Sequence, residues 1–140
     1  MTRISFYIGR TNSLQARLLL ACRLIDKACA QSMHVYVHTD NHSTCAQLDE
    51  LIWTWDDISF IPHAMAPADG ENTRVLLGHD FEPMVHCDYL INLSQSTPAF
   101  FPRFARMAEI LDQEEEVLHA GRKRYKFYQA RGYNLDYYQL

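Results

Sequence analysis

Glycine is scarce in this chain, which has only five glycines among 140 residues. A nucleotide-binding α/β domain usually has a glycine-rich turn after its first strand, where the backbone approaches phosphates at a helix N-terminus. The corresponding turn here is "IGRTNSLQ", and its single glycine is Gly9. Neither G-x-G-x-x-G nor a Walker A lysine occurs in the sequence. We therefore expect no bound cofactor.

Long apolar runs and closely spaced cysteine pairs are also missing. The longest apolar run, around "LLLAC", is far shorter than the ~20 residues that a membrane-spanning helix needs. The N-terminal "MTRISFYIGR" lacks the pattern of a secretory signal. No C-x-x-C pair occurs, so we expect reduced and mostly buried thiols at Cys22, Cys29, Cys45 and Cys87. These features favour a cytoplasmic protein that does not cross a membrane.

Metal-binding and nucleophile motifs are not found either. His34 and His38 fall on one predicted strand about 13 Å apart, which is too far for two ligands of one Zn²⁺. Ser94 follows a predicted strand but lies outside any G-x-S-x-G elbow. Cys87 is adjacent to His86, yet neighbouring side chains on an extended chain point to opposite faces. We expect no metal site and no catalytic residues.

The composition that remains is that of one globular domain. Hydrophobic residues make up 48% of the chain and charged residues 21%, and the formal net charge is −4. The length fits the commonest size of a single domain, so we expect one domain spanning residues 1–140. The acidic balance argues against a general nucleic-acid binder, which is usually strongly basic.

Segments rich in β-branched and aromatic residues alternate with segments of helical periodicity. The predicted strands are 4–8, 34–38, 74–78 and 89–94, and 58–62 is predicted to be a fifth strand or an extended segment. The predicted helices are 14–31, 44–53, 98–111 and 113–131. This alternation predicts a layered α/β fold with a mainly parallel sheet and helices on both of its faces.

Capping signals accompany the predicted helix ends. Asn12 or Ser13 is expected to cap the first helix, and Ser43 the second. Asp112 followed by Glu115 has the form of a capping box, with Asp in place of Ser or Thr. Glycine is typical of the position just after a helix, so Gly132 predicts the end of the last helix at about residue 131.

The stretch "LDELIWTWDDISFIPH" (48–63) gathers large aromatic residues near a predicted helix end. Trp53 and Trp55 are two positions apart, so they cannot share one helix face, and at least one should be partly exposed. Exposed tryptophan often marks a partner site, because tryptophan is enriched among interface hot spots. The alternative is that both indoles cover the core.

The closing stretch "GRKRYKFYQARGYNLDYYQL" (121–140) holds five of the 13 lysines and arginines and six aromatic residues. Arg122 and Lys126 are one helical turn apart. They flank a stripe of residues that recur every three or four positions along one face of the predicted helix. Gly121 in mid-helix costs roughly 1 kcal/mol relative to alanine, which suggests close approach by another element or by a ligand. The stripe comprises Val117, Gly121, Tyr125 and Tyr128.

Three interpretations of this basic, aromatic helix remain open on composition. It is a solvated helix end, since cations are favoured near a helix C-terminus. Alternatively, it binds single-stranded nucleic acid directly, with rings that stack on bases and cations that neutralise phosphates. In the third interpretation it binds an acidic peptide through arginine–carboxylate contacts beside an apolar groove.

The same two stretches, with the opening "SFYI", resemble the chi-subunit family of bacterial DNA polymerase III. The resemblance extends from the first strand to Leu135 and is most specific in these stretches. The family pattern is L-D-x-x-L/I-W, then F-x-P-H, then R-Y-x-x-Y-x-x-x-G-[FY]-N-L. It is matched by Leu48, Asp49, Trp53, Phe60, Pro62, His63, Arg124, Tyr125, Tyr128, Gly132, Tyr133, Asn134 and Leu135.

The resemblance implies a Rossmann-like three-layer fold without a nucleotide site, and a non-catalytic accessory subunit of the replicative polymerase. Such a subunit bridges the psi subunit of the clamp-loader complex to the acidic C-terminal tail of single-stranded DNA-binding protein (SSB), and so meets DNA only indirectly. A repair helicase uses the psi-facing surface in some relatives. The resemblance assigns psi binding to Trp53, Phe60, Pro62 and His63, and SSB-tail binding to Arg122, Lys126, Tyr125, Val117 and Leu111.

One departure from the family bears on the tail site. Leu118 and His119 lie where some relatives place further positive charge, and the run 114–116 is acidic. We therefore expect a site that is weaker than in relatives or shifted toward Lys123 and Lys126. Direct binding of single-stranded nucleic acid by the C-terminal helix is the alternative function. A small nucleotide-dependent enzyme on a Rossmann-like sheet is the third.

Overall fold

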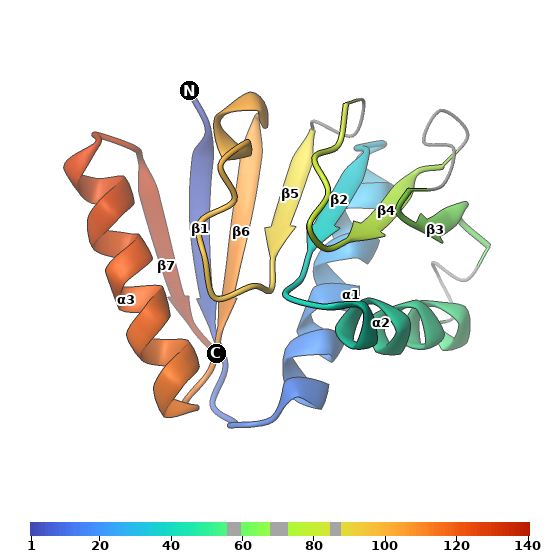
Figure 1. Cartoon of the computed structure of the whole chain (residues 1–140), viewed down its shortest axis with the longest axis horizontal. Coiled ribbons are helices and arrows are strands. Elements are labelled where there is room, and N and C mark those ends of the chain that lie inside the picture. The colour runs from blue at the N-terminus through green and yellow to red at the C-terminus, as the bar shows by residue number, and fades with distance from the viewer. Residues whose placement is uncertain (56–59, 68–72, 85–87) are drawn as a thin grey trace.

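The computed structural model describes residues 1–55, 60–67, 73–84 and 88–140. Within these residues seven strands form one sheet with the order β3-β4-β2-β5-β6-β1-β7, and every pairing between neighbours is parallel (Figure 1). The strands are β1 Arg3–Ile8, β2 Val35–His38, β3 His63–Met65, β4 Val75–Gly78, β5 Tyr89–Asn92, β6 Arg106–Leu111 and β7 Leu135–Gln139.

In the part of the chain that the structure describes, three α-helices cover the sheet: α1 (Leu14–Ala30), α2 (His42–Thr54) and α3 (Glu115–Ala130). One apolar core packs α1 and α2 against one face of the sheet, and a second core packs α3 against the other. In β1, Ile4, Phe6 and Ile8 face the α3 side, whereas Tyr7 faces α1, as the period of two in a strand requires. The predicted three-layer α/β fold with a mainly parallel sheet is confirmed.

The predicted helix 98–111 is wrong. A short 3₁₀ helix, η2 (Phe101–Arg103), is followed by β6, which lies between β1 and β5 inside the sheet. A parallel strand in that position is buried on both faces, so it reads as a continuous apolar run that periodicity cannot distinguish from a buried helix. Strand β7, which pairs with β1 at the sheet edge, was not predicted.

The stretch 58–62 was predicted to be a strand or an extended segment, and the strand alternative is wrong where the structure tests it. Positions 58 and 59 lie outside the described residues, and Phe60 to Pro62 are not in a strand. The strand in this region, β3, begins at His63 and pairs with β4. The other four predicted strands correspond to β1, β2, β4 and β5.

The helix ends match the predicted capping residues with two exceptions. Ser13 caps α1 as predicted, because its side chain accepts a hydrogen bond from the Ala16 amide. Helix α2 begins at His42, earlier than predicted, because Asn41 rather than Ser43 accepts from the Thr44 amide. Gly132 follows α3 with φ +82°, the left-handed conformation expected of a residue that ends a helix.

The predicted capping box at the start of α3 is the second exception. Helix α3 begins at Glu115, and its capping residue Glu114 makes no side-chain cap. Asp112 is buried instead, where its carboxylate lies 3.3 Å from Nε of Arg17 in α1 and accepts from the Glu114 amide. The side chain therefore ties the β6–α3 connection to α1.

The cysteines behave as small hydrophobic residues. Cys22, Cys29 and Cys45 are free thiols, and Cys87 lies outside the described residues. Burial raises the pKa of the Cys22 thiol to about 12, so this thiol stays protonated and unreactive near neutral pH. No helix in the described part of the chain is long and apolar enough to cross a membrane.

Candidate docking sites

The turn that would hold phosphates in a nucleotide-binding relative is occupied by the chain itself. Gly9 donates its amide to the Leu111 carbonyl, and its own carbonyl accepts from the side chain of Gln113. The Gln113 amide in turn donates to the Thr11 carbonyl. The β6–α3 connection therefore packs against this turn, and the Gly9 amide, which a phosphate would use in a glycine-rich loop, already donates to the chain.

A cavity of about 710 Å³ lies at the carboxyl ends of β2, β4 and β5, where open α/β sheets often bind nucleotides. Its lining includes Asp40, Asp80 and Glu82, and no lysine or arginine among the described residues. Carboxylates repel phosphate groups, so this lining disfavours a nucleotide. Nor do three or more potential metal-ligating side chains come together anywhere in the described residues.

A second cavity, of about 550 Å³, lies between α3 and the β1–β7 side of the sheet, and we call it the α3 cavity. Helix α3 approaches the sheet closely at Gly121, where an added Cβ would overlap the Leu111 side chain of β6. The close approach predicted from this mid-helix glycine is confirmed. The lining comprises Phe6, Ile8, Leu111, Leu118, Gly121, Arg122, Tyr125, Lys126 and Tyr137.

The α3 cavity combines an apolar floor with a cationic rim. Its apolar side chains come from β1, β6 and α3, and Tyr125 packs edge-on against Phe6 with ring centroids 5.1 Å apart. Arg122 and Lys126 are exposed and lie one turn apart along α3. This arrangement suits a small apolar group attached to a carboxylate, because guanidinium and ammonium groups bind carboxylates with charge-assisted hydrogen bonds.

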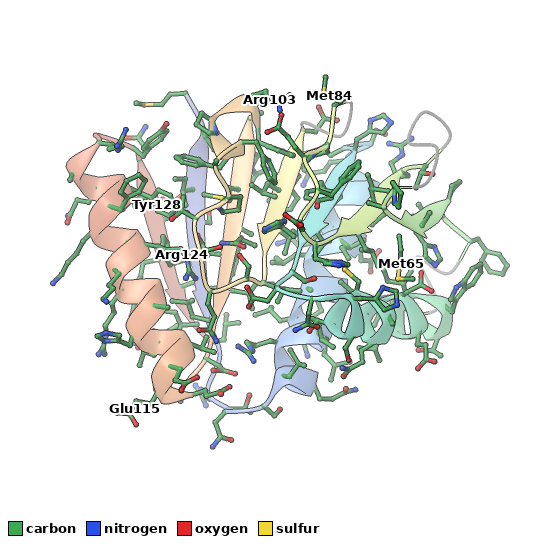
Figure 2. All side chains as sticks on the ribbon, in the orientation of Figure 1. Met65, Met84, Arg103, Glu115, Arg124 and Tyr128 are labelled. Carbon is green, nitrogen blue, oxygen red and sulfur yellow. The ribbon has the colours of Figure 1, made fainter. Side chains whose placement is uncertain are left out.

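Four of the five residues assigned to tail binding by the resemblance line the α3 cavity. Val117 does not, because it is buried in the core beneath α3, and Leu118 takes a place in the lining instead. Sequence reasoning also missed Tyr137, since it missed β7, and it missed Phe6 and Ile8 because their side of β1 was not assigned to this site. The acidic run 114–116 lies at the N-terminal end of α3, where Figure 2 labels Glu115.

Two conspicuous residues of the closing stretch are internal. Arg124 and Tyr128 project from α3 toward the sheet (Figure 2), and both contact Glu109 of β6, which is 0% exposed. Arg124 donates to this carboxylate from Nε and Nη2 at 3.0–3.1 Å, and the Tyr128 hydroxyl donates at 2.6 Å. Burial, reinforced by the neighbouring Glu109 carboxylate, raises the pKa of Tyr128. These groups anchor α3 to the sheet and are not available to a partner.

An aromatic surface lies at the other end of the sheet, around the C-terminus of α2. We call the exposed side chains of Trp53, Phe60 and Pro62 the Trp53 surface. Trp53 is 61% exposed and Phe60 is 93% exposed. Trp55 is half-buried and packs against the α1–α2 core, so the prediction that at least one tryptophan is exposed is confirmed.

His63, the fourth residue assigned to psi binding, lies beneath the Trp53 surface and not on it. Its side chain is only 1% exposed, and its ring packs under the Trp53 indole with centroids 4.4 Å apart. Its Nδ1 lies 2.8 Å from the Ile61 carbonyl oxygen, and its Nε2 lies 3.6 Å from Oδ1 of Asp49. His63 therefore contacts a partner indirectly at most.

The two sites lie at opposite edges of the sheet. Strand β3, next to the Trp53 surface, is one edge of the sheet, and β7, beside the α3 cavity, is the other (Figure 1). The molecule is thus a three-layer α/β domain with a cationic apolar cavity at one end and exposed aromatic side chains at the other. Large exposed aromatic residues and charged apolar clefts are features of proteins that dock other proteins.

Comparison with known proteins identifies the family. The family model described as "DNA polymerase III chi subunit, HolC" matches residues 1–136. The chain is 39% identical over 140 residues to the DNA polymerase III subunit chi of Pseudomonas aeruginosa, covering 100% of this chain and 98% of that relative. It is 24% identical over 143 residues to the DNA polymerase III subunit chi of Escherichia coli K12, covering 97% of each. This chain belongs to the DNA polymerase III chi subunit family.

Proposed function

We propose that this chain is a non-catalytic adaptor that joins the psi subunit of DNA polymerase III to the acidic C-terminal tail of SSB. The observation that carries the proposal is the α3 cavity, with its apolar floor beneath Arg122 and Lys126. The SSB tail of the family resemblance ends in acidic residues, a small apolar tip and a free carboxylate. The apolar tip of the tail can pack on the apolar floor of the α3 cavity, and the tail carboxylates can pair with the cations on its rim.

The separation of the two sites supports a bridging role. Because the Trp53 surface and the α3 cavity flank opposite edges of the sheet, psi and the tail can bind at the same time without contact. The Trp53 surface is the proposed psi site, and a repair helicase that used the same surface would compete with psi. The tail contact should be micromolar, about −8 kcal/mol, and should weaken with salt.

Direct binding of single-stranded DNA is less well supported. Stacking on bases requires accessible ring faces, and Tyr128 is 0% exposed while Tyr125 is half-buried against Phe6. Tyr137 and Tyr138 of β7 are 52% and 46% exposed, but Tyr138 stacks on Tyr7 and Tyr137 packs edge-on against Tyr125. Phe127 is 38% exposed, but the Arg131 guanidinium lies 4.6 Å from the centre of its ring. Tight binding of a bare oligonucleotide at physiological salt would favour this alternative over the adaptor.

The Arg122→Glu substitution should weaken binding of a labelled SSB-tail peptide by about 2 kcal/mol, or about 30-fold. The substitution removes the guanidinium that pairs with a tail carboxylate and puts a second, repelling carboxylate in its place. Isothermal titration or fluorescence anisotropy measures the change. Lys123 is exposed on the same helix but does not line the α3 cavity, so the cavity does not support a shift of the site toward Lys123, and Lys123→Glu is the matched control. Equal losses of affinity in the two variants would indicate a general charge attraction and not binding at the α3 cavity. An Arg122→Glu variant that binds the peptide as tightly as the wild type would refute the site.

Gly121→Ala tests the floor of the α3 cavity. The added methyl group should push the Leu111 side chain into the cavity and reduce tail affinity. Overpacking costs about 1–3 kcal/mol, which the better helix propensity of alanine offsets by about 1 kcal/mol, so stability should fall by no more than about 2 kcal/mol. Thermal unfolding and peptide titration on the same sample separate the two effects. Wild-type affinity in this variant would show that the tail does not enter the cavity.

A further inference from the structure

A third cavity, of about 280 Å³, lies between α1 and the carboxyl ends of β1 and β6, and we call it the α1 cavity. Leucines supply most of its apolar lining, and its charged lining consists of Arg10, Arg17, Arg23 and Asp112. The chain as a whole is acidic, with a formal net charge of −4. Three arginines around one small cavity therefore make a cationic site on an acidic protein.

Two of these charged side chains, Arg17 and Asp112, are mostly buried, with exposed fractions of 12% and 1%. Nε of Arg17 lies 3.3 Å from Oδ2 of Asp112, but neither atom has a hydrogen-bond partner within the described residues. Buried polar atoms are nearly always hydrogen-bonded, so an unpaired donor beside an unpaired acceptor suits a ligand group that offers both functions. A peptide group does so, because its N–H donates and its C=O accepts.

Arg10 and Arg23 supply the positive charge that is left for a ligand. Arg17 already pairs with the two carboxylates of the β6–α3 connection. Arg10 and Arg23 are exposed, and no carboxylate side chain in the described part of the chain pairs with either of them. Nε of Arg10 donates to the Leu140 carbonyl, which holds its guanidinium beside the cavity. Guanidinium groups bind carboxylates well, so the α1 cavity suits an acidic peptide segment.

The α1 cavity adjoins the α3 cavity around the end of the sheet. Leu111 lines both cavities, and Ile8, which lines the α3 cavity, is followed directly by Gly9, which lines the α1 cavity. The carboxyl ends of β1, β6 and β7 come together between the start of α1 and the start of α3 (Figure 1). An extended peptide advances about 3.3 Å per residue, so about three to five residues pass from one cavity to the other.

We propose that the α1 cavity receives the acidic residues that precede the apolar tip of the SSB tail, and that Arg10 and Arg23 bind them. The tip occupies the α3 cavity, and the chain before it turns around the carboxyl end of β1. A nucleic acid is another polyanion that arginines attract, but the buried Asp112 carboxylate and the leucine lining disfavour phosphates. The inference rests on the proposed tail site and adds to it a second cavity that selects acidic tails.

Three labelled peptides separate the two cavities: the whole tail, the apolar tip alone with its free carboxylate, and the whole tail with its acidic residues replaced by their amides. The double variant Arg10→Gln with Arg23→Gln should bind the whole tail about tenfold more weakly, because each exposed ion pair contributes about threefold. It should bind the other two peptides as tightly as the wild type does. Lys27→Gln is the matched control, since Lys27 is exposed one turn after Arg23 but does not line the α1 cavity. Equal losses for all three peptides would give the arginines a structural role and overturn the inference.

Methyl resonances of the wild type locate the peptides directly, since Leu19 lines the α1 cavity and Leu118 lines the α3 cavity. The whole tail should shift both sets of methyl resonances, and the tip alone only those of Leu118. A whole tail that shifts only the Leu118 methyls would overturn the inference and leave the α3 cavity as the tail site. A whole tail that shifts only the Leu19 methyls would refute the α3 cavity and support the α1 cavity. If the double variant lost affinity for a bare oligonucleotide and not for the tail, the α1 cavity would belong to nucleic acid and the inference would be wrong.

Discussion

Replacing Arg124 with alanine is expected to lower the free energy of unfolding by about 3–5 kcal/mol, the largest stability effect that we expect in this fold. Glu109 is 0% exposed, and Arg124 is the one cation that pairs with it among the described residues. Removal of the guanidinium leaves the carboxylate buried with hydrogen bonds from Tyr128 and Asn92 but without a counter-charge. An uncompensated buried charge costs far more than the loss of a surface ion pair.

Urea denaturation of Arg124→Ala measures this loss. Arg122→Ala is the matched control, because Arg122 is exposed on the same helix and its truncation should change stability by less than about 0.5 kcal/mol. The double variant Arg124→Ala with Glu109→Gln should regain part of the loss, since the buried charge is then gone. If Arg124→Ala were no less stable than the control, the proposed anchoring of α3 would be wrong.

Replacing Trp53 and Phe60 together with alanine should abolish capture of the psi subunit. Each exposed aromatic side chain at the centre of an interface contributes about 2 kcal/mol or more, so the pair accounts for about 4 kcal/mol, or about a thousandfold in affinity. Phe60 is 93% exposed, so its truncation removes little packing, whereas loss of the Trp53 indole uncovers the buried His63 ring beneath it. The variant should therefore unfold at a modestly lower temperature than the wild type but remain folded at the temperature of the binding assay.

Co-purification with psi and titration with the SSB-tail peptide are the two measurements for this variant. Tail binding should remain intact, because Trp53 and Phe60 do not line the α3 cavity. Phe127→Ala is a suitable control, since Phe127 is an aromatic residue of α3 that is 38% exposed and lies far along the chain from α2. Loss of psi and tail together would indicate misfolding, and retained psi capture would rule out the Trp53 surface as its site.

Much of the fold follows from patterns that local physics determines. The apolar spacing of 14–31 with Ser13 before it predicted α1 and its cap, and the alternation of strands and helices predicted a parallel three-layer fold. The motifs around Trp53 and Arg124 indicated the family, which the comparisons confirm. Patterns failed at β6 and β7, because a strand buried on both faces has no period of two and a short polar edge strand has little apolar signal.

Tertiary structure alone decided which of the conspicuous side chains face outward. In the sequence Arg122 and Arg124 look equivalent, but Glu109 from β6 draws Arg124 into the core and leaves Arg122 on the rim of the α3 cavity. His63 looks like a surface residue beside Phe60 and Pro62, yet Asp49 and Trp53 of α2 enclose it. The sequence by itself determined the family and the layered fold, because these depend on local periodicity and motifs. The sites depend on contacts between residues far apart in the chain, and folding brings those residues together.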